Sequence, residues 1–90
     1  MVPNGPGAGG YAVRALARAC AIVAAAPANT RHRTAVIEAW GLARLVARGL
    51  LSGEDVARAL DSALQAAGKP AGEGAKIAAW AVAQRARGAV

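Results

Sequence analysis

Residues 27–51 constrain the fold of this chain more than any other stretch, because a turn signal, a basic cluster and a helical repeat follow one another there. Pro27 has no backbone N–H and cannot continue a helix from the residues before it. The Asn-Thr pair two residues later is typical of an N-cap, so we expect a new helix to begin near Arg31. Gly49 can adopt the left-handed conformation that ends a helix. The sequence therefore predicts a helix from Arg31 to the residue before this glycine.

The two sides of this helix differ in character. At 100° per residue, one side is apolar and is expected to be buried; it consists of Val36, Ala39, Trp40, Ala43, Val46 and Ala47. A neighbouring stripe consists of Arg33, Ile37, Arg44 and Arg48. The helix therefore offers one face to a core and a basic edge to solvent.

Helix breakers divide the rest of the chain into three further helices. A first helix is expected over residues 11–26, where apolar residues recur at i, i+3 and i+4. Ser52 opens another with a capping box, and the Gly68-Lys69-Pro70 run ends it. The last is expected over residues 73–87. No stretch alternates as a half-buried strand does, so the predicted fold class is all-α, a small compact bundle of four short helices.

The predicted bundle occupies residues 11–90 and has a thin core. Residues 1–10 contain two prolines and four glycines and read as a disordered leader or linker. Alanine accounts for 27 of the 90 residues and phenylalanine for none. A buried methyl group contributes only about 0.8 kcal/mol, so the few large side chains must carry the core. We assign Trp40 and Trp80 to it, and expect Trp40→Ala to cost about 3–5 kcal/mol.

Charge is distributed unevenly along the chain. The net charge is +6; residues 1–50 carry six arginines and one acid, whereas residues 51–90 carry five bases and four acids. A basic half beside a nearly neutral half indicates a polyanionic partner, with nucleic acid favoured over an anionic membrane. The alternative is a solvated arginine-rich surface without a ligand.

Several functional classes are disfavoured by composition. Cys20 is the sole cysteine and falls on the apolar side of its helix, so a disulfide framework is excluded and the cytoplasm is the expected compartment. One cysteine and one histidine cannot form a zinc site, and no acid pair accompanies a histidine or serine, so we expect neither an enzyme nor a cofactor. Arginines interrupt every apolar run, so no membrane-spanning helix is expected.

In the first three expected helices, a set of residues at fixed spacing resembles the pattern of a known domain. The stretch resembles the small helical domain of phage and plasmid replication primases, which sits beside the polymerase or Toprim core, as in bifunctional primase-polymerases. The similarity covers about residues 11–87. The residues that carry it are Tyr11-Ala12, Ala15-Leu16, Val23-Ala24, Ala26-Pro27, Arg31, Ala39-Trp40, Leu42, Leu45-Val46-Ala47, Gly49, Leu51, Val56, Ala59-Leu60 and Gly68.

The resemblance implies a helix bundle that helps a primase to hold template strand and nucleotide, with catalysis supplied by another domain. Of the polar residues that the family uses, Arg31 alone is retained. Elsewhere in that set this chain departs from the family pattern, with Ala19, His32, Val36 and Lys76.

The candidate site begins with the Arg31-His32-Arg33 cluster at a helix start. Backbone N–H groups there attract anions, and paired guanidinium groups would reinforce a phosphate site, whereas without a ligand cations oppose the helix dipole. An exposed turn with screened charges is the alternative. The full set of candidate nucleic-acid contacts adds the basic stripe and the one aromatic residue not assigned to the core: Arg31, His32, Arg33, Arg44, Arg48 and Tyr11.

Three functional hypotheses follow from these patterns. The first is a non-catalytic nucleic-acid-binding module for DNA replication, whose partner is a single strand, with DNA favoured, or a replication protein. The second is a protein–protein interaction module that docks on an acidic protein or forms a homodimer, because alanine faces allow helices of two chains to pack closely. The third is that the chain is a domain of a longer parent protein.

Overall fold

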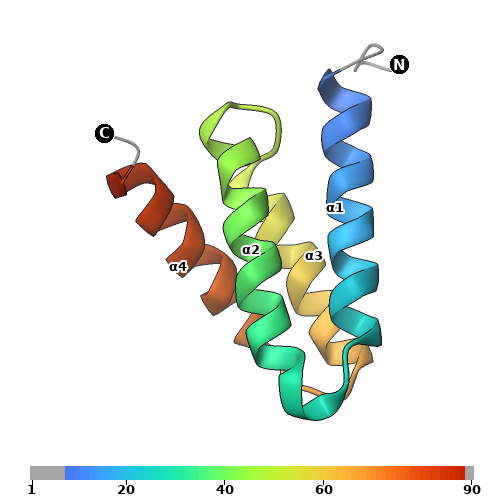
Figure 1. Ribbon diagram of the computed structural model, residues 1–90. Coiled ribbons are helices and arrows are strands. Elements are labelled where there is room, and N and C mark those ends of the chain that lie inside the picture. Colours follow the sequence, from blue (N-terminus) through green and yellow to red (C-terminus); the bar gives the residue numbers. More distant parts are fainter. Residues whose placement is uncertain (1–7, 89–90) are drawn as a thin grey trace.

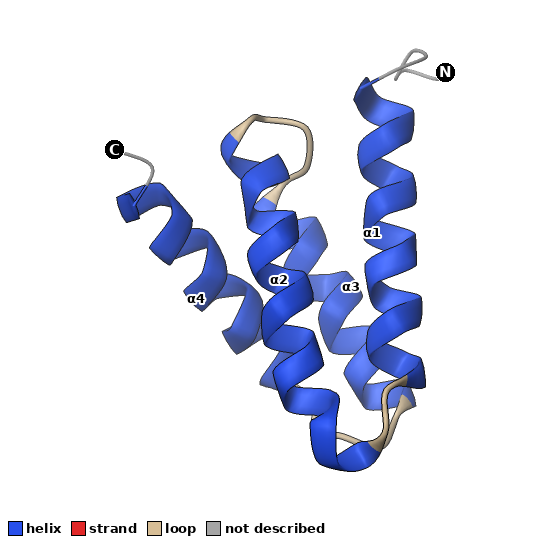
Figure 2. Ribbon diagram, in the orientation of Figure 1, coloured by secondary structure: helices blue, strands red, loops and turns tan. Residues whose placement is uncertain are grey.

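The computed structural model describes residues 8–88 of the chain, with side chains described for residues 10–87. Helices account for most of this range (Figure 2). They are α1 (Ala8–Ala25), the short 3-10 helix η1 (Ala28–Thr30), α2 (Arg31–Ala47), α3 (Gly53–Ala66) and α4 (Glu73–Gly88). The described residues contain no strand, so the prediction of a small all-α bundle of four helices is confirmed.

The start of α1 differs from the prediction. The helix begins at Ala8 rather than Tyr11, so the last three residues of the expected leader are helical. Extending an existing helix is far easier than nucleating one, and this outweighs the penalty of about 1 kcal/mol for each glycine. The remainder of that leader, residues 1–7, lies outside the described residues.

Glycines end α2 and α3, as the sequence predicted. Gly49 has φ 78° and Gly68 has φ 100°, in the left-handed region that glycine adopts without strain. In each case the N–H of the next residue donates to the carbonyl five residues before it: Leu50 to Leu45 (2.9 Å) and Lys69 to Leu64 (2.8 Å). These bonds satisfy carbonyls of the last helical turn and fix the direction of the connection that follows.

The two predicted N-caps behave differently. Ser52 Oγ accepts from the N–H of Asp55 at 2.9 Å, as expected for the start of α3. Thr30 occupies the N-cap position of α2, but its hydroxyl donates to the carbonyl of Pro27 (3.2 Å) and caps no N–H. The 3-10 turn accounts for this difference. It supplies carbonyl partners, Pro27 and Ala28, to the N–H groups of Thr30 and Arg31.

The other three α-helices all contact α2. In Figure 1, α2 lies between α1 and α4, with α3 behind it. α1 and α4 each pack against both α2 and α3. The side of α2 that faces away from α3 is therefore left open to solvent between its two flanking helices.

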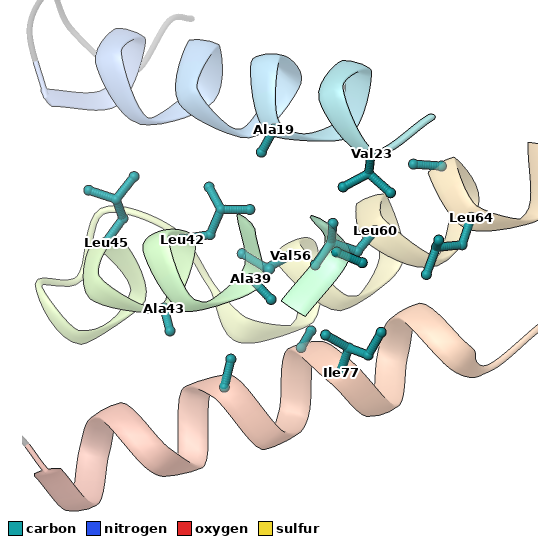
Figure 3. Packing of buried hydrophobic residues seen from close by; sticks show 14 of the residues in the cluster. Ala19, Val23, Ala39, Leu42, Ala43, Leu45, Val56, Leu60, Leu64 and Ile77 are labelled. Carbon is teal, nitrogen blue, oxygen red and sulfur yellow. The ribbon is translucent and has the colours of Figure 1, made fainter. Parts of the chain in front are cut away.

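Small apolar side chains fill the core (Figure 3). The largest fully buried side chains are Val23, Val56, Leu60 and Leu64. Alanines dominate the contact between α2 and α4, where Ala39, Ala43, Ala78 and Ala81 are all buried. Because alanine lets two helix backbones approach closely, this contact contains no space for a large ring.

The tryptophans therefore lie outside the core, and their assignment to it was wrong. Trp40 is 38% exposed and Trp80 is 48% exposed. At 100° per residue, Trp40 lies about 100° around the helix axis from Ala39, outside the buried stripe of α2 and close to Arg33. Helices that approach through alanine leave an indole no room between them, so both rings lie over the outside of the contact.

A carboxylate on α3 caps the start of α4. Asp61 Oδ1 accepts from the backbone N–H groups of Gly72 (2.9 Å), Gly74 (2.9 Å) and Ala75 (3.3 Å). The two helices touch here, since a Cβ atom added to Gly74 would lie 2.4 Å from the Asp61 backbone. Desolvation would raise the pKa of Asp61, but the hydrogen bonds from these N–H groups and from the Gln65 amide outweigh it and lower the pKa.

Candidate nucleic-acid interface

Arg31, the first member of the predicted basic cluster, is engaged within the protein. Its Nη2 donates to the carbonyl of Ala26 (2.7 Å) and its Nη1 to that of Ala67 (3.4 Å). These carbonyls lie at the C-terminal ends of α1 and α3, where a cation complements the helix dipole. The guanidinium group is half-buried and ties three helices together, so it does not extend toward a ligand as the sequence interpretation supposed.

His32 also has a partner within the protein. Its Nδ1 lies 3.1 Å from Glu73 Oε2, which joins the starts of α2 and α4. A carboxylate can only accept, so Nδ1 carries the proton in this contact. Lys69 Nζ lies 4.0 Å from the same oxygen. A carboxylate thus already compensates the positive charge that was predicted here.

Two further arginines of α2, together with Arg48 at its C-cap, form one exposed stripe. Arg33, Arg44 and Arg48 are exposed, and among residues 8–88 none of them forms an ion pair with a carboxylate. Their spacing places them on the side of α2 that faces away from α3, over about 22 Å of helix. Ile37 lies exposed between them. The basic edge predicted for this helix is therefore present.

The tryptophans join this stripe to α4. The Trp40 and Trp80 ring centroids are 6.0 Å apart, with 38° between the ring planes. The Arg85 guanidinium carbon lies 4.2 Å from the Trp40 ring centroid, and Arg85 Nε donates to the Trp40 carbonyl at 3.2 Å. We call the set Arg33, Arg44, Arg48, Arg85, Trp40 and Trp80 the basic face.

Sequence reasoning missed the Trp40–Trp80–Arg85 part of the basic face. Arg85 was not among the predicted contacts, and both rings were assigned to the core. A signal was present for Trp40, which lies within about 40° of Arg33 and Arg44 around the helix axis. No comparable signal existed for Arg85, because its contact with Trp40 joins residues that are 45 positions apart.

An open groove lies beside the Trp80 ring. It has a volume of about 330 Å³ and is lined by Val36, Ile77 and Trp80, with His32 and Lys76 as its polar members. This volume is at the lower end of the range for small-molecule sites.

Tyr11, the predicted stacking residue, lies at the other edge of α2. It is 53% exposed and lines a depression of about 150 Å³ between α1 and α2, together with Arg18, Glu38 and Arg44. The Glu38 carboxylate opposes binding of a phosphate there. Tyr11 and the tryptophans are therefore on opposite flanks of the arginine stripe, and we leave Tyr11 outside the basic face.

No group of three or more histidine, cysteine, aspartate or glutamate side chains within residues 8–88 is placed to hold a metal ion. None of the helices in the range combines the length and the apolar character that crossing a membrane requires.

Comparisons with models of protein families, with curated proteins and with solved structures return no match for this chain. The resemblance to the primase helical domain therefore stays a prediction from the sequence.

Proposed function

We propose that this protein binds single-stranded nucleic acid, with DNA favoured, through the basic face. The observation that carries the proposal is the exposed Trp40–Trp80 pair with Arg85 stacked on it, on the same side of the bundle as the arginine stripe of α2. Cationic side chains that follow a strand and aromatic rings that stack on unpaired bases are the two components of most single-strand sites.

Each component has a separate role in this proposal. Arg33, Arg44 and Arg48 are free of carboxylate partners within the described range and can contact phosphates. Trp80 has the more exposed ring of the pair and offers it to a base. Base edges meet few hydrogen-bonding groups on this face, so binding depends on charge and stacking rather than on sequence.

The primase-like register supports a place for this module beside a replication enzyme. The bundle would then hold the template strand while another protein or domain performs catalysis. This part of the proposal depends on the spacing of Ala26-Pro27, Arg31, Trp40 and Gly49 in the sequence rather than on any contact in the structure.

A titration of labelled single-stranded DNA at several salt concentrations tests the proposal. Four arginine contacts predict a slope of roughly −3 in a plot of log affinity against log salt, at about −0.7 per contact. Replacing Arg33, Arg44 and Arg48 together by glutamine should reduce affinity and bring the slope to roughly −0.7, because the contact of Arg85 remains. Arg58→Gln is the matched control, because Arg58 lies on α3 and pairs with Asp55. No binding at 50 mM salt, or equal binding by the triple variant, would refute the proposal.

Self-association is a second candidate, favoured by an apolar groove between α1 and α3. The groove has a volume of about 580 Å³ and no charged residue in its lining, which includes Val13, Leu16, Ala17 and Cys20. Burial raises the pKa of the Cys20 thiol. Because the groove carries no charge, it does not attract an acidic protein. The same groove on a second copy of the chain is an uncharged apolar surface that could pack against it.

Sedimentation velocity tests this second candidate. A homodimer should dissociate when Ala17→Arg places a charge in the groove. Ala25→Arg, on α1 but outside the groove lining, should leave it intact. A monomer at high protein concentration would exclude self-association and leave the nucleic-acid proposal unaffected.

A further inference from the structure

Arg85 differs from the other arginines of the basic face in being held in place. Its Nε donates to the Trp40 carbonyl, and its guanidinium carbon lies 4.2 Å from the centroid of the Trp40 ring. Arg33, Arg44 and Arg48 have no such contacts in the described residues and are free to rotate. The position of one guanidinium group is therefore fixed before any ligand binds.

The fixed guanidinium group keeps most of its hydrogen-bonding capacity. A guanidinium group has five N–H donors, and the contact with Trp40 uses the one on Nε. The four donors on Nη1 and Nη2 form the outer edge, which matches two oxygens of a phosphate. Arg85 forms no ion pair with a carboxylate within residues 8–88, so this edge is available.

We infer that Arg85, held over Trp40, is the anchoring contact for one phosphate of the bound strand and places the adjoining base on Trp80. The inference rests on the proposed function and assigns separate roles within it. Arg85 binds the phosphate, Trp40 is a positioning residue that orients Arg85, and Trp80 receives the base. Because Arg85 covers one side of the Trp40 ring, the Trp80 ring is the better platform.

The fixed position of Arg85 should strengthen binding beyond the effect of its charge. Ordering a free arginine on a phosphate removes rotational freedom of its side chain, whereas Arg85 has lost that freedom already. Arg85 should therefore contribute more to affinity than any arginine of the α2 stripe. Lysine keeps the charge but has neither the flat group that stacks on indole nor the paired donors.

Arg85→Lys, compared with Arg87→Lys, provides the central test. Both positions are in the last turn of α4, so both variants keep the same cation near the helix end. In titrations of labelled oligothymidylate, we expect Arg85→Lys to weaken binding about tenfold without changing the salt slope. Arg87→Lys should stay within about twofold of the unmodified protein. Equal effects of the two substitutions would overturn the inference.

A double-mutant cycle tests the role of Trp40. Trp40→Leu should weaken binding about as much as Arg85→Lys, and the two together should weaken it little further, because both remove the same oriented contact. Multiplicative losses would show that the residues act independently and would overturn the positioning role. Urea unfolding of each variant ensures that affinities are compared between folded proteins.

Nuclear magnetic resonance of the arginine side chains separates this role from a purely structural one. Oligothymidylate should shift the Nη resonances of Arg85 and leave those of Arg87 in place. If the protein binds the strand and Arg85 resonances do not move, the anchor is refuted while the proposed function stands. If the unmodified protein shows no salt-dependent binding, both are refuted.

Discussion

At the scale of single residues, the start of α2 shows how neighbours of similar charge take on different tasks. Arg31 bonds to the carbonyls that end α1 and α3, His32 meets Glu73, and Arg33 is exposed. Their side chains leave the helix 100° apart, so each meets a different environment. A cluster of cations in the sequence therefore does not form a cluster in space.

Identical substitutions at two of these positions should differ in their effect on stability. Arg31→Met removes two charge-assisted hydrogen bonds and leaves helix-end carbonyls without partners, so we expect a loss of about 1.5–3 kcal/mol in the free energy of unfolding. Arg33→Met should change stability by less than about 0.5 kcal/mol, since Arg33 is exposed. Urea unfolding measures both. Equal stability losses would contradict the structural role of Arg31.

Gly74 permits the close contact between α3 and α4. An added Cβ would lie 2.4 Å from the Cα and N atoms of Asp61, which belong to the backbone and cannot rotate away. We expect Gly74→Ala to lower the free energy of unfolding by about 1–3 kcal/mol, despite the better helix propensity of alanine. Gly41→Ala is the matched control. It meets no atom within 4 Å and should gain about 0.5–1 kcal/mol. A stabilising Gly74→Ala would disprove the close packing.

At the scale of elements, local signals predicted the helices and long-range contacts could not be predicted. The ends of α2 and α3 followed from Gly49 and Gly68, and the start of α3 from Ser52, because these signals act within one helical turn. The cap of α4 comes from Asp61. The residues whose N–H groups donate to its carboxylate lie 11 to 14 positions later in the sequence. Nothing near α4 in the sequence indicates such a partner.

The same limit applies to the candidate site. The arginine stripe of α2 was predicted because it depends on the period of a single helix. The contact of Arg85 with Trp40, and the engagement of Arg31 by the ends of α1 and α3, depend on how helices pack. A thin alanine core is itself evident from composition. The exposure of both tryptophans could not be predicted from composition, because it depends on how closely α2 and α4 approach each other.

The Asp61 cap makes the α3–α4 pair sensitive to acid. The pKa of Asp61 is lowered from 3.8 in the folded protein, so the carboxylate favours folding at pH values above 3.8. That contribution is lost as the pH falls from 3.8 through the lower folded-state pKa. Asp61→Asn should lower the thermal unfolding midpoint at pH 7, and the difference from the unmodified protein should shrink toward pH 3. A difference that stays constant over this range would contradict the role of the charge.

At the scale of the whole molecule, the arrangement of helices determines where the proposed nucleic-acid strand can lie. With α3 behind α2, the exposed side of α2 is bounded by α1 and α4 (Figure 1). Arginines follow the length of α2, and the aromatic pair lies where α4 meets it. In the proposed complex, a nucleic-acid strand that follows the arginine stripe lies beside the Trp40–Trp80 pair, where an unpaired base can stack and a base inside a duplex cannot.

This geometry predicts a preference for single strands that depends on one ring. At equal salt, a single strand should bind about tenfold more tightly than the duplex of the same sequence, because stacking of one base contributes about 1–3 kcal/mol. Trp80→Leu should remove most of that preference and leave the salt dependence unchanged, since leucine takes away the aromatic surface but no charge. Tyr11→Leu, at the opposite flank of α2, should preserve the preference. Competition between the two forms of DNA measures each case, and a preference that survives Trp80→Leu would mean that bases stack elsewhere.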